Sequence, residues 1–323
     1  MMLFREDREF RQAILIASAQ LGLAPAFVEK DYWVTQVLRS LAARFENGFV
    51  FKGGTSLSKG YGLIDRFSED VDILVTESSG ASIKQRETQL RHMTETVAED
   101  LGLEWEQSRM PGRGSTPNRA DIIKYPKLVE GLADVAAEGR GVLLETGFGP
   151  GEWPCQMVPI MPLMVTVLDM DPSEFDDTRS FTVRALKPLR TLVEKLALLH
   201  HIAVGYEQDP DAADERCGRH YHDIGRLLED PATRNALKDR KQFERILAEM
   251  EHVSAEQYGG WTPRPDAGYG ASPAFSPPAD SPLRVWLQER YDDAAALMPS
   301  KIDGRWPKFP SVLKQIAQHA ELL

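Results

Sequence analysis

Two short segments of this chain place glycines, hydroxyls, a lysine and carboxylates in an order that suits phosphate chemistry. The second segment ends in an Asp-Val-Asp run, and the first supplies Gly53, Gly54, Thr55, Ser56 and Lys59. Glycines let a backbone turn tightly and approach a phosphate group closely. Thr and Ser hydroxyls and a lysine ammonium can then bind that phosphate, so we predict these five residues to hold a nucleotide.

The Asp-Val-Asp run opens a predicted strand at residues 70–75, because β-branched and apolar residues dominate that segment. Alternation along a strand puts Asp70 and Asp72 on one face. Two carboxylates one pleat apart suit Mg²⁺, which favours a few carboxylates together with phosphate oxygens. Two such ions would stabilise both the attacking and the leaving oxygen of an in-line displacement. The pattern therefore favours metal-dependent nucleotidyl transfer from an NTP.

The glycine pair follows a predicted strand at residues 49–51. We expect a helix to begin at Thr55 or Ser56, since both residue types are good N-caps. The amides at the start of that helix would face the phosphates. A glycine turn or an Asp-x-Asp run alone also occurs on ordinary turns and solvated strands, but their succession is more specific.

The run Phe-Lys-Gly-Gly-Thr-Ser-Leu-Ser-Lys at residues 51–59, then Arg-Phe-Ser-Glu-Asp-Val-Asp at 66–72, resembles the DNA polymerase β-like nucleotidyltransferases. It looks more closely like the AbiEii/AbiGii-type toxins of abortive-infection and toxin–antitoxin systems, which share the long spacer between the glycines and the carboxylates. The resemblance implies an α+β fold, in which a polymerase β-like nucleotidyltransferase domain with a mixed sheet precedes a mostly helical C-terminal domain. We place these domains at residues 1–175 and 176–323.

Lys195 lies on a helix predicted from Pro188 to about His201, at the border of its apolar face. A lysine in that position can bury its stem and present its ammonium at a cleft, although a surface lysine beside a core helix gives the same pattern. The resemblance implies that this lysine serves the triphosphate.

Asp223 lies on a second predicted helix, at residues 219–228. The resemblance implies that this aspartate is needed for activity; an exposed ion pair with Arg219 is the structural alternative. If both helices contribute to catalysis, Lys195 and Asp223 must meet Asp70 and Asp72 in a cleft between the domains. Without nucleotide, Lys195 would pair with Asp223 or with an acid of the strand.

A third metal-binding carboxylate is usual on a later strand of polymerase β-like sites. Glu145, on a strand predicted at residues 142–145, and Asp169, after a strand predicted at 163–168, are the candidates. We favour Glu145, because its strand otherwise has the composition of a buried strand. A solvated acid at the end of a strand would give the same pattern.

Other elements follow from periodicity and turn residues. A helix that begins near Glu29 and runs through Leu41 would pack across the nucleotide domain. A further strand is expected at 121–125, helices at 83–101, 235–250, 283–297 and 312–323, and a long irregular loop at 262–282.

Composition limits the class of protein. The 323 residues are 42% hydrophobic, which is enough for a sizeable core, and the net charge of −11 argues against binding nucleic acid through bulk charge. No apolar run reaches membrane-spanning length and no signal-peptide pattern appears. The two cysteines, Cys155 and Cys217, lack metal-ligand spacing, so we expect a reduced cytoplasmic protein.

The resemblance implies a toxin that transfers an NMP to an acceptor, with the tRNA 3′ end as one candidate acceptor and phage defence as its setting. An antitoxin encoded nearby would be its partner. Nucleotidyl transfer to a protein or a small molecule is an alternative, and a catalytically idle partner that only senses nucleotide is another.

Overall fold

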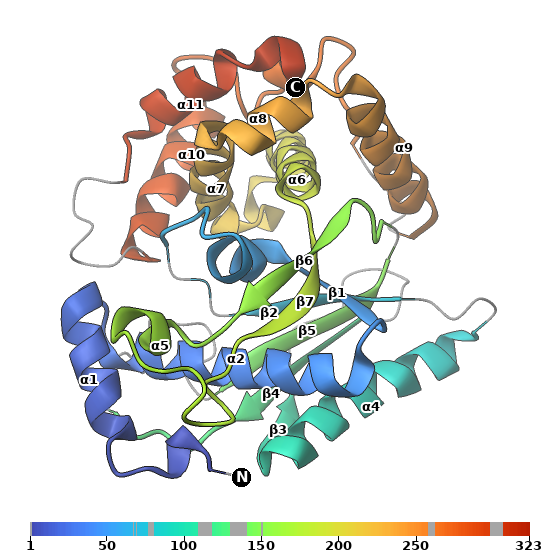
Figure 1. The fold of residues 1–323 in the computed structure, drawn as a ribbon. Helices are drawn as coiled ribbons and strands as arrows, with labels where there is room; N and C mark the ends of the chain where they lie inside the picture. Colours follow the sequence, from blue (N-terminus) through green and yellow to red (C-terminus); the bar gives the residue numbers. More distant parts are fainter. Residues whose placement is uncertain are drawn as a thin grey trace. The chain divides into compact units, whose positions relative to one another are not determined.

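The structure is a computed structural model that describes residues 2–66, 68, 70–76, 81–108, 118–129, 141–149, 151–257, 262–297 and 306–323. These residues divide into two units, drawn in Figure 1. The sheet unit contains residues up to 62 and from 68 to 186, and the helical unit contains the rest. Residues 63–66, from the long spacer, therefore belong to the helical unit, and residues 176–186 to the sheet unit.

Within the described residues, the sheet unit is built on a mixed sheet of seven strands in the order β3-β4-β5-β2-β1-β7-β6. The strands are β1 (Phe49–Lys52), β2 (Val71–Val75), β3 (Glu104–Gln107), β4 (Asn118–Lys124), β5 (Val142–Phe148), β6 (Cys155–Ile160) and β7 (Phe181–Leu186). The β1–β7 and β2–β5 pairs are parallel and the others are antiparallel. Together with the helical remainder, this mixed sheet confirms the predicted α+β class.

Helices α2 (Pro25–Phe45) and α4 (Ile83–Leu101) cover one face of this sheet, and α1 (Phe10–Leu21) packs against α2 (Figure 1). Local sequence explains α4 well, because Ser82 and Gln85 form a capping box and Gly102 ends the helix at a φ of 66°. The prediction of α4 is confirmed to the residue. One core joins the alternate strand residues Phe51, Val71 and Ile73 to the apolar side of α2.

The helical unit is organised around α7 (Gly218–Glu229), which contacts α6, α8, α10 and α11. Their bounds, with those of α9, are α6 (Pro188–Gln208), α8 (Pro231–Leu237), α9 (Arg240–Gln257), α10 (Pro282–Asp293) and α11 (Phe309–Ala317). Residues 262–281 form the predicted irregular loop, but it is held in place: Tyr221 donates to the carbonyl of Ala274, and Ser272 bonds His200.

Two predicted elements are wrong. Residues 163–168 form no strand, because Leu163–Val167 is the short helix α5, which packs on α1 and α2. Burial of Met164 and Val165 there outweighs the strand preference of the β-branched residues. The single helix predicted at 235–250 is two helices, since α8 begins at Pro231 under an Asp230 cap and ends at Leu237.

The helix expected to begin at Thr55 or Ser56 instead begins at Gly53, with one turn, α3 (Gly53–Thr55), followed by a π-helical turn, Ser56–Gly60. The chain leaves β1 directly into this turn, so Thr55 and Ser56 lie inside it rather than at its cap. Sequence patterns also missed β3, β6 and β7.

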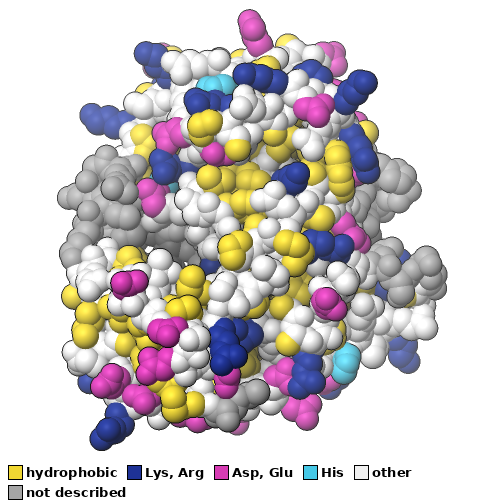
Figure 2. Space-filling model, viewed as in Figure 1, with side chains coloured by type: hydrophobic (Ala, Val, Ile, Leu, Met, Phe, Trp, Pro, Cys, Tyr) yellow, Lys and Arg dark blue, Asp and Glu magenta, His cyan; other side chains and the backbone are white. Residues whose placement is uncertain are grey.

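Charged side chains of both signs are interspersed over the face drawn in Figure 2, on the part of it that the structure describes. Neighbouring opposite charges screen one another, so this face presents no extended field of one sign. Among the described helices none is by itself long and apolar enough to cross a membrane; α1 and α2 meet that test only as a pair, bent by 114°.

Two helical glycines test the packing around α7. A Cβ on Gly218 would lie 1.9 Å from the Arg290 carbonyl oxygen of α10, whereas one on Gly205 of α6 would meet nothing within 4 Å. We expect Gly218→Ala to lower the free energy of unfolding by about 1–3 kcal/mol through overpacking. Gly205→Ala should raise it by about 0.5–1 kcal/mol, because alanine is the better helix former. Urea unfolding of both variants measures this; equal effects would contradict the close α7–α10 packing.

Candidate active site

A row of charged residues crosses three neighbouring strands of the sheet unit. Asp72 on β2 lies directly opposite Lys52 on β1 and Glu145 on β5. Adjacent strands are about 4.8 Å apart and directly opposite side chains share a face, so the two carboxyl groups are neighbours. We call Lys52, Asp72 and Glu145 the carboxylate row; Asp70, just before β2, belongs to the same face by alternation.

This row lies on the sheet face opposite α2 and α4. Val71 and Ile73 alternate with Asp72 and enter the core beneath those helices. On the other face, Val50 and Leu74 form a separate small apolar cluster. The sheet thus uses one face for the core and keeps the polar row on the other.

Burial raises the pKa of Glu145 to about 8, and the charge of Asp72, a hydrogen bond to Asp72 and the charge of Asp70 act in the same direction. Lys52 opposes the rise. Near neutral pH a protonated Glu145 therefore donates to the Asp72 carboxylate. Like charges held this close are costly unless a proton or a cation lies between them.

Gly53 explains how the turn comes so near to these acids. Its φ is 77°, which favours glycine, and a Cβ there would lie 2.1 Å from Oδ2 of Asp72. The Asp72 carboxylate therefore packs directly on the backbone of the glycine turn. Any side chain at position 53 would displace it.

The donor set fits a hard divalent cation. Asp70, Asp72 and Glu145 supply only carboxylate oxygens, the ligands that Mg²⁺ prefers, and a cation would oppose the burial and the repulsion that raise the pKa of Glu145. Among the residues that the structure describes, no group of three or more histidine, cysteine, aspartate or glutamate side chains is arranged to hold a metal ion by itself. A metal ion beside these acids would need further oxygen ligands, such as waters and substrate phosphates. Asp169, the alternative third acid, follows helix α5 rather than a strand and lacks this register.

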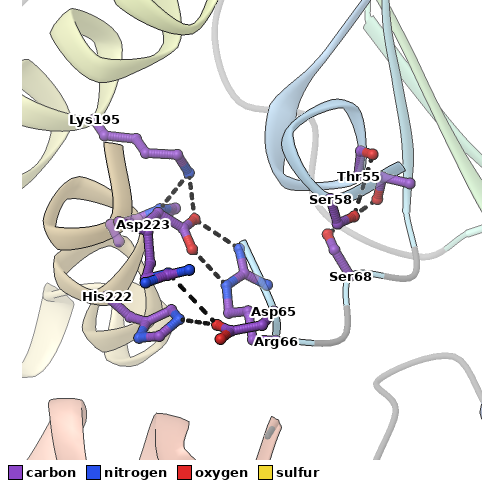
Figure 3. A network of polar contacts seen from close by, with 10 residues as sticks. Thr55, Ser58, Asp65, Arg66, Ser68, Lys195, His222 and Asp223 are labelled. Carbon is purple, nitrogen blue, oxygen red and sulfur yellow. Dashed lines mark hydrogen bonds and ion pairs between the residues drawn. The ribbon is translucent and has the colours of Figure 1, made fainter. Parts of the chain in front are cut away.

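The side chains predicted to bind phosphate have protein partners. Thr55 Oγ1 donates to Ser68 Oγ at 3.0 Å (Figure 3). Ser56 Oγ donates to the Gly53 carbonyl at 2.9 Å. Lys59 Nζ lies 2.7 Å from Asp31 Oδ1 and also donates to a backbone carbonyl, that of Met161. These side chains would need to exchange partners to hold a nucleotide.

The helical unit brings Lys195, Asp223 and the spacer residue Arg66 together (Figure 3). Lys195 Nζ lies 2.8 Å from Asp223 Oδ2, which confirms the predicted pairing of these residues. Arg66 donates twice to the same carboxylate, from Nε to Oδ1 and from Nη2 to Oδ2, each at 2.7 Å. Asp223 is fully buried, and Arg66 is only 4% exposed. The structural alternative of an exposed ion pair for Asp223 is therefore excluded.

Burial and neighbouring charges have opposing effects on the pKa values of Asp223 and Lys195. Burial by itself would raise the pKa of Asp223, but the charges and hydrogen bonds of Arg66 and Lys195 outweigh it and hold that pKa well below its usual range. Burial lowers the pKa of Lys195, and Asp223 opposes that change. Burial, with the charge of Lys195, also keeps the pKa of His220 well below its ordinary value, so His220 is neutral and its Nδ1 accepts from Lys195 Nζ at 3.1 Å.

We call Arg66, Lys195, Arg219, His220 and Asp223 the Asp223 cluster. Three of these residues are cations, one is a carboxylate and His220 is neutral, so the cluster carries excess positive charge. Arg219 Nε is buried and has no hydrogen-bond partner within the part of the chain that the structure describes. A buried surplus of cations with an unsatisfied donor is suited to an anion.

Residue patterns alone did not identify Lys52, Arg66 and His220. Arg66 lies inside the run that carries the family resemblance, and Lys52 directly precedes the glycine pair, so position was the available signal. His220 gave none, because a histidine on an amphipathic helix is usually a packing residue.

Residues 36–304 match the family described as nucleotidyl transferase AbiEii toxin, type IV TA system. The chain belongs to this AbiEii toxin family. It is thus a nucleotidyltransferase toxin of a type IV toxin–antitoxin system. Among solved structures, MenT4, a nucleotidyltransferase toxin from Mycobacterium tuberculosis H37Rv, aligns over 94% of this chain and 98% of its own, at 16% identity and a TM-score of 0.40. No curated protein sequence matches the chain.

In this AbiEii toxin, the contact between Gly53 and Asp72 gives a direct test. We expect Gly53→Ala to lower nucleotidyl transfer by about 100-fold, because the added methyl group displaces the carboxylate. Gly62→Ala is the matched control, since Gly62 also has a positive φ, of 62°, but a Cβ there meets nothing within 4 Å. Equal losses in both variants would show that backbone strain, not the Asp72 contact, is responsible.

The raised pKa of Glu145 predicts a pH dependence of stability in the metal-free toxin. The folded pKa of about 8 exceeds the ordinary 4.5, so the folded chain holds this proton more tightly than the unfolded chain. The resulting stabilisation is full below about pH 4.5 and is lost as the pH rises to about 8. The free energy of unfolding of Glu145→Gln should fall less over that pH range than that of the wild type. Glu104→Gln, at an exposed strand position, should behave as wild type. Urea unfolding at several pH values measures this; a wild-type profile in Glu145→Gln would contradict it.

Proposed function

We propose that this toxin transfers an NMP from an NTP to a hydroxyl acceptor through the carboxylate row and the Asp223 cluster. The observation that carries the proposal is the charge that each set leaves unbalanced within its own unit. Asp72 and Glu145 need a cation beside them, and the Asp223 cluster needs an anion. Metal ions and the phosphates of an NTP have these charges.

Each residue then has a role. Asp70, Asp72 and Glu145 would hold divalent metal, two Mg²⁺ ions in the full site, and the backbone of the Gly53–Gly54 turn would lie against the phosphates. The bound metal would supply charge stabilisation for the attacking and leaving oxygens. Thr55, Ser56 and Lys59 would line the same turn.

Lys195 would pair with the triphosphate as pyrophosphate leaves from the attacked α-phosphate. Asp223 would not take a proton from the acceptor, because its pKa lies well below its usual range and both of its oxygens are engaged. Its role would be to orient Lys195. Arg219, with its unsatisfied Nε, would be a second donor to the phosphates.

For the acceptor we propose the 3′ end of tRNA, the target that the family resemblance suggested, and for the partner an antitoxin encoded beside the toxin in the cytoplasm of a phage-exposed bacterium. The mixed charge on the face drawn in Figure 2 and the net charge of −11 argue against binding through bulk positive charge. The acceptor would therefore be recognised locally, by its terminal nucleotides.

Labelled NTPs with Mg²⁺ test the reaction. We expect Asp72→Asn and Lys195→Met each to lower transfer by at least about 100-fold, because each removes a charge that faces the transferred group. Above about pH 8, where Glu145 is ionised, Asp72→Asn should keep or raise the melting temperature of the metal-free protein, since it relieves repulsion with Glu145. Asp169→Asn, at the alternative third acid, is the control and should transfer at the wild-type rate.

Four incubations with labelled NTP identify the acceptor: one each with total RNA, with purified tRNA, with periodate-oxidised tRNA that lacks a 3′ hydroxyl, and with total protein. Label in intact tRNA but not in oxidised tRNA supports the proposal. Label in protein alone would show that the acceptor is a protein and not tRNA. No label in any arm would make the chain a nucleotide sensor and overturn the proposed function.

A further inference from the structure

The spacer between the glycine turn and the carboxylates has a partner in the helical unit. Residues 63–66 are grouped with that unit, although the chain on both sides belongs to the sheet unit. Two neighbouring spacer residues bind two neighbouring residues of α7: Asp65 accepts from His222 Nε2 at 3.2 Å, and Arg66 binds Asp223. The long spacer thus has a specific attachment.

The atoms of the Asp223 carboxylate are shared in a definite way. Arg66 occupies Oδ1 and Oδ2 in a two-bond fork, and Lys195 shares Oδ2. Because a guanidinium fork fixes the plane of a carboxylate, the direction from which Lys195 binds Oδ2 depends on Arg66. Removal of the fork leaves that carboxylate free to rotate.

We propose that Arg66 is a positioning residue of the transfer reaction, which holds Asp223 so that Asp223 holds Lys195. Arg66 itself touches no reacting atom. This inference rests on the proposed role of Lys195.

The proposal predicts that two variants, Arg66→Gln and Asp223→Asn, change the pKa of Lys195 in opposite directions. Four groups of the described chain face its ammonium: Asp223, Arg66, Arg219 and His220. Arg66→Gln removes a nearby cation, so the pKa of Lys195 should rise. Asp223→Asn removes its anion, so that pKa should fall.

The ¹³Cε resonance of Lys195, assigned by its loss in Lys195→Arg, reports this pKa as the pH is varied in the full-length protein. Arg226→Gln is the matched control, because Arg226 also lies near Asp65 but does not bind Asp223. It should leave the titration of Lys195 unchanged. An unchanged titration in Arg66→Gln would overturn the proposal.

A double-mutant cycle on transfer separates positioning from substrate contact. Arg66→Gln should lower kcat by about 100-fold with a smaller change in the KM for NTP. If Arg66 acts through Asp223, the double variant Arg66→Gln/Asp223→Asn should have nearly the same kcat as Asp223→Asn alone. Losses that multiply would mean that Arg66 acts independently, which contradicts the proposal.

Arg66→Lys covers the case in which the glutamine variant does not fold. It keeps the charge but loses the fork, so Lys195 should titrate nearly as in wild type while kcat falls. Wild-type kcat in Arg66→Lys would overturn the proposal. If the wild-type toxin transfers no nucleotide at all, the proposed function fails, whereas the Lys195 titration still decides whether Arg66 and Asp223 control that lysine.

Discussion

The site depends on one constraint: it contains charges that the protein itself does not fully neutralise. In the sheet unit, β2 and β5 are in a register that sets Asp72 beside Glu145, and burial together with the charge of Asp72 raises the pKa of Glu145 to about 8. In the helical unit, Arg66 and Lys195 share the carboxylate of Asp223, and the charge of Arg219 also acts on Lys195. Neither arrangement is favourable for folding alone, because buried charges need partners. A ligand of opposite charge bound to either set would stabilise the folded state by mass action.

The Asp223 carboxylate also determines which segments can act together. It lies on α7 and binds Lys195 from α6 and Arg66 from the spacer, which are far apart in the sequence. An isolated buried carboxylate would take up a proton, but two cations keep this one ionised. Its two oxygens are thereby occupied, so it acts as an anchor for donors rather than as a base. Loss of either cation would change the position and the ionisation of the other.

Local sequence patterns predicted the parts of this structure that depend on local physics. Helix α4 was predicted to the residue, and the structure shows that Ser82, Gln85 and Gly102 form its start and its end. Strand β2 was predicted because its residues are β-branched and apolar. The strand predicted at residues 163–168 was wrong, because burial against α1 and α2, rather than the local sequence, decides the conformation of this segment. The pairing of Lys195 with Asp223 was predicted only through the family resemblance, because no spacing rule relates residues on separate helices.

Arg66 shows why part of the site cannot be read from spacing. In a minimal enzyme of this type the glycine turn and the carboxylate strand are joined by a shorter segment, and the added residues look like a tolerated surface loop. The structure gives them a buried ion pair instead, and a buried arginine is costly unless a carboxylate meets it with good geometry. The spacer must therefore be long enough for Arg66 to reach Asp223 and return to Asp70. Its length is set by a contact in the helical unit, which a pattern confined to the turn and the strand does not contain.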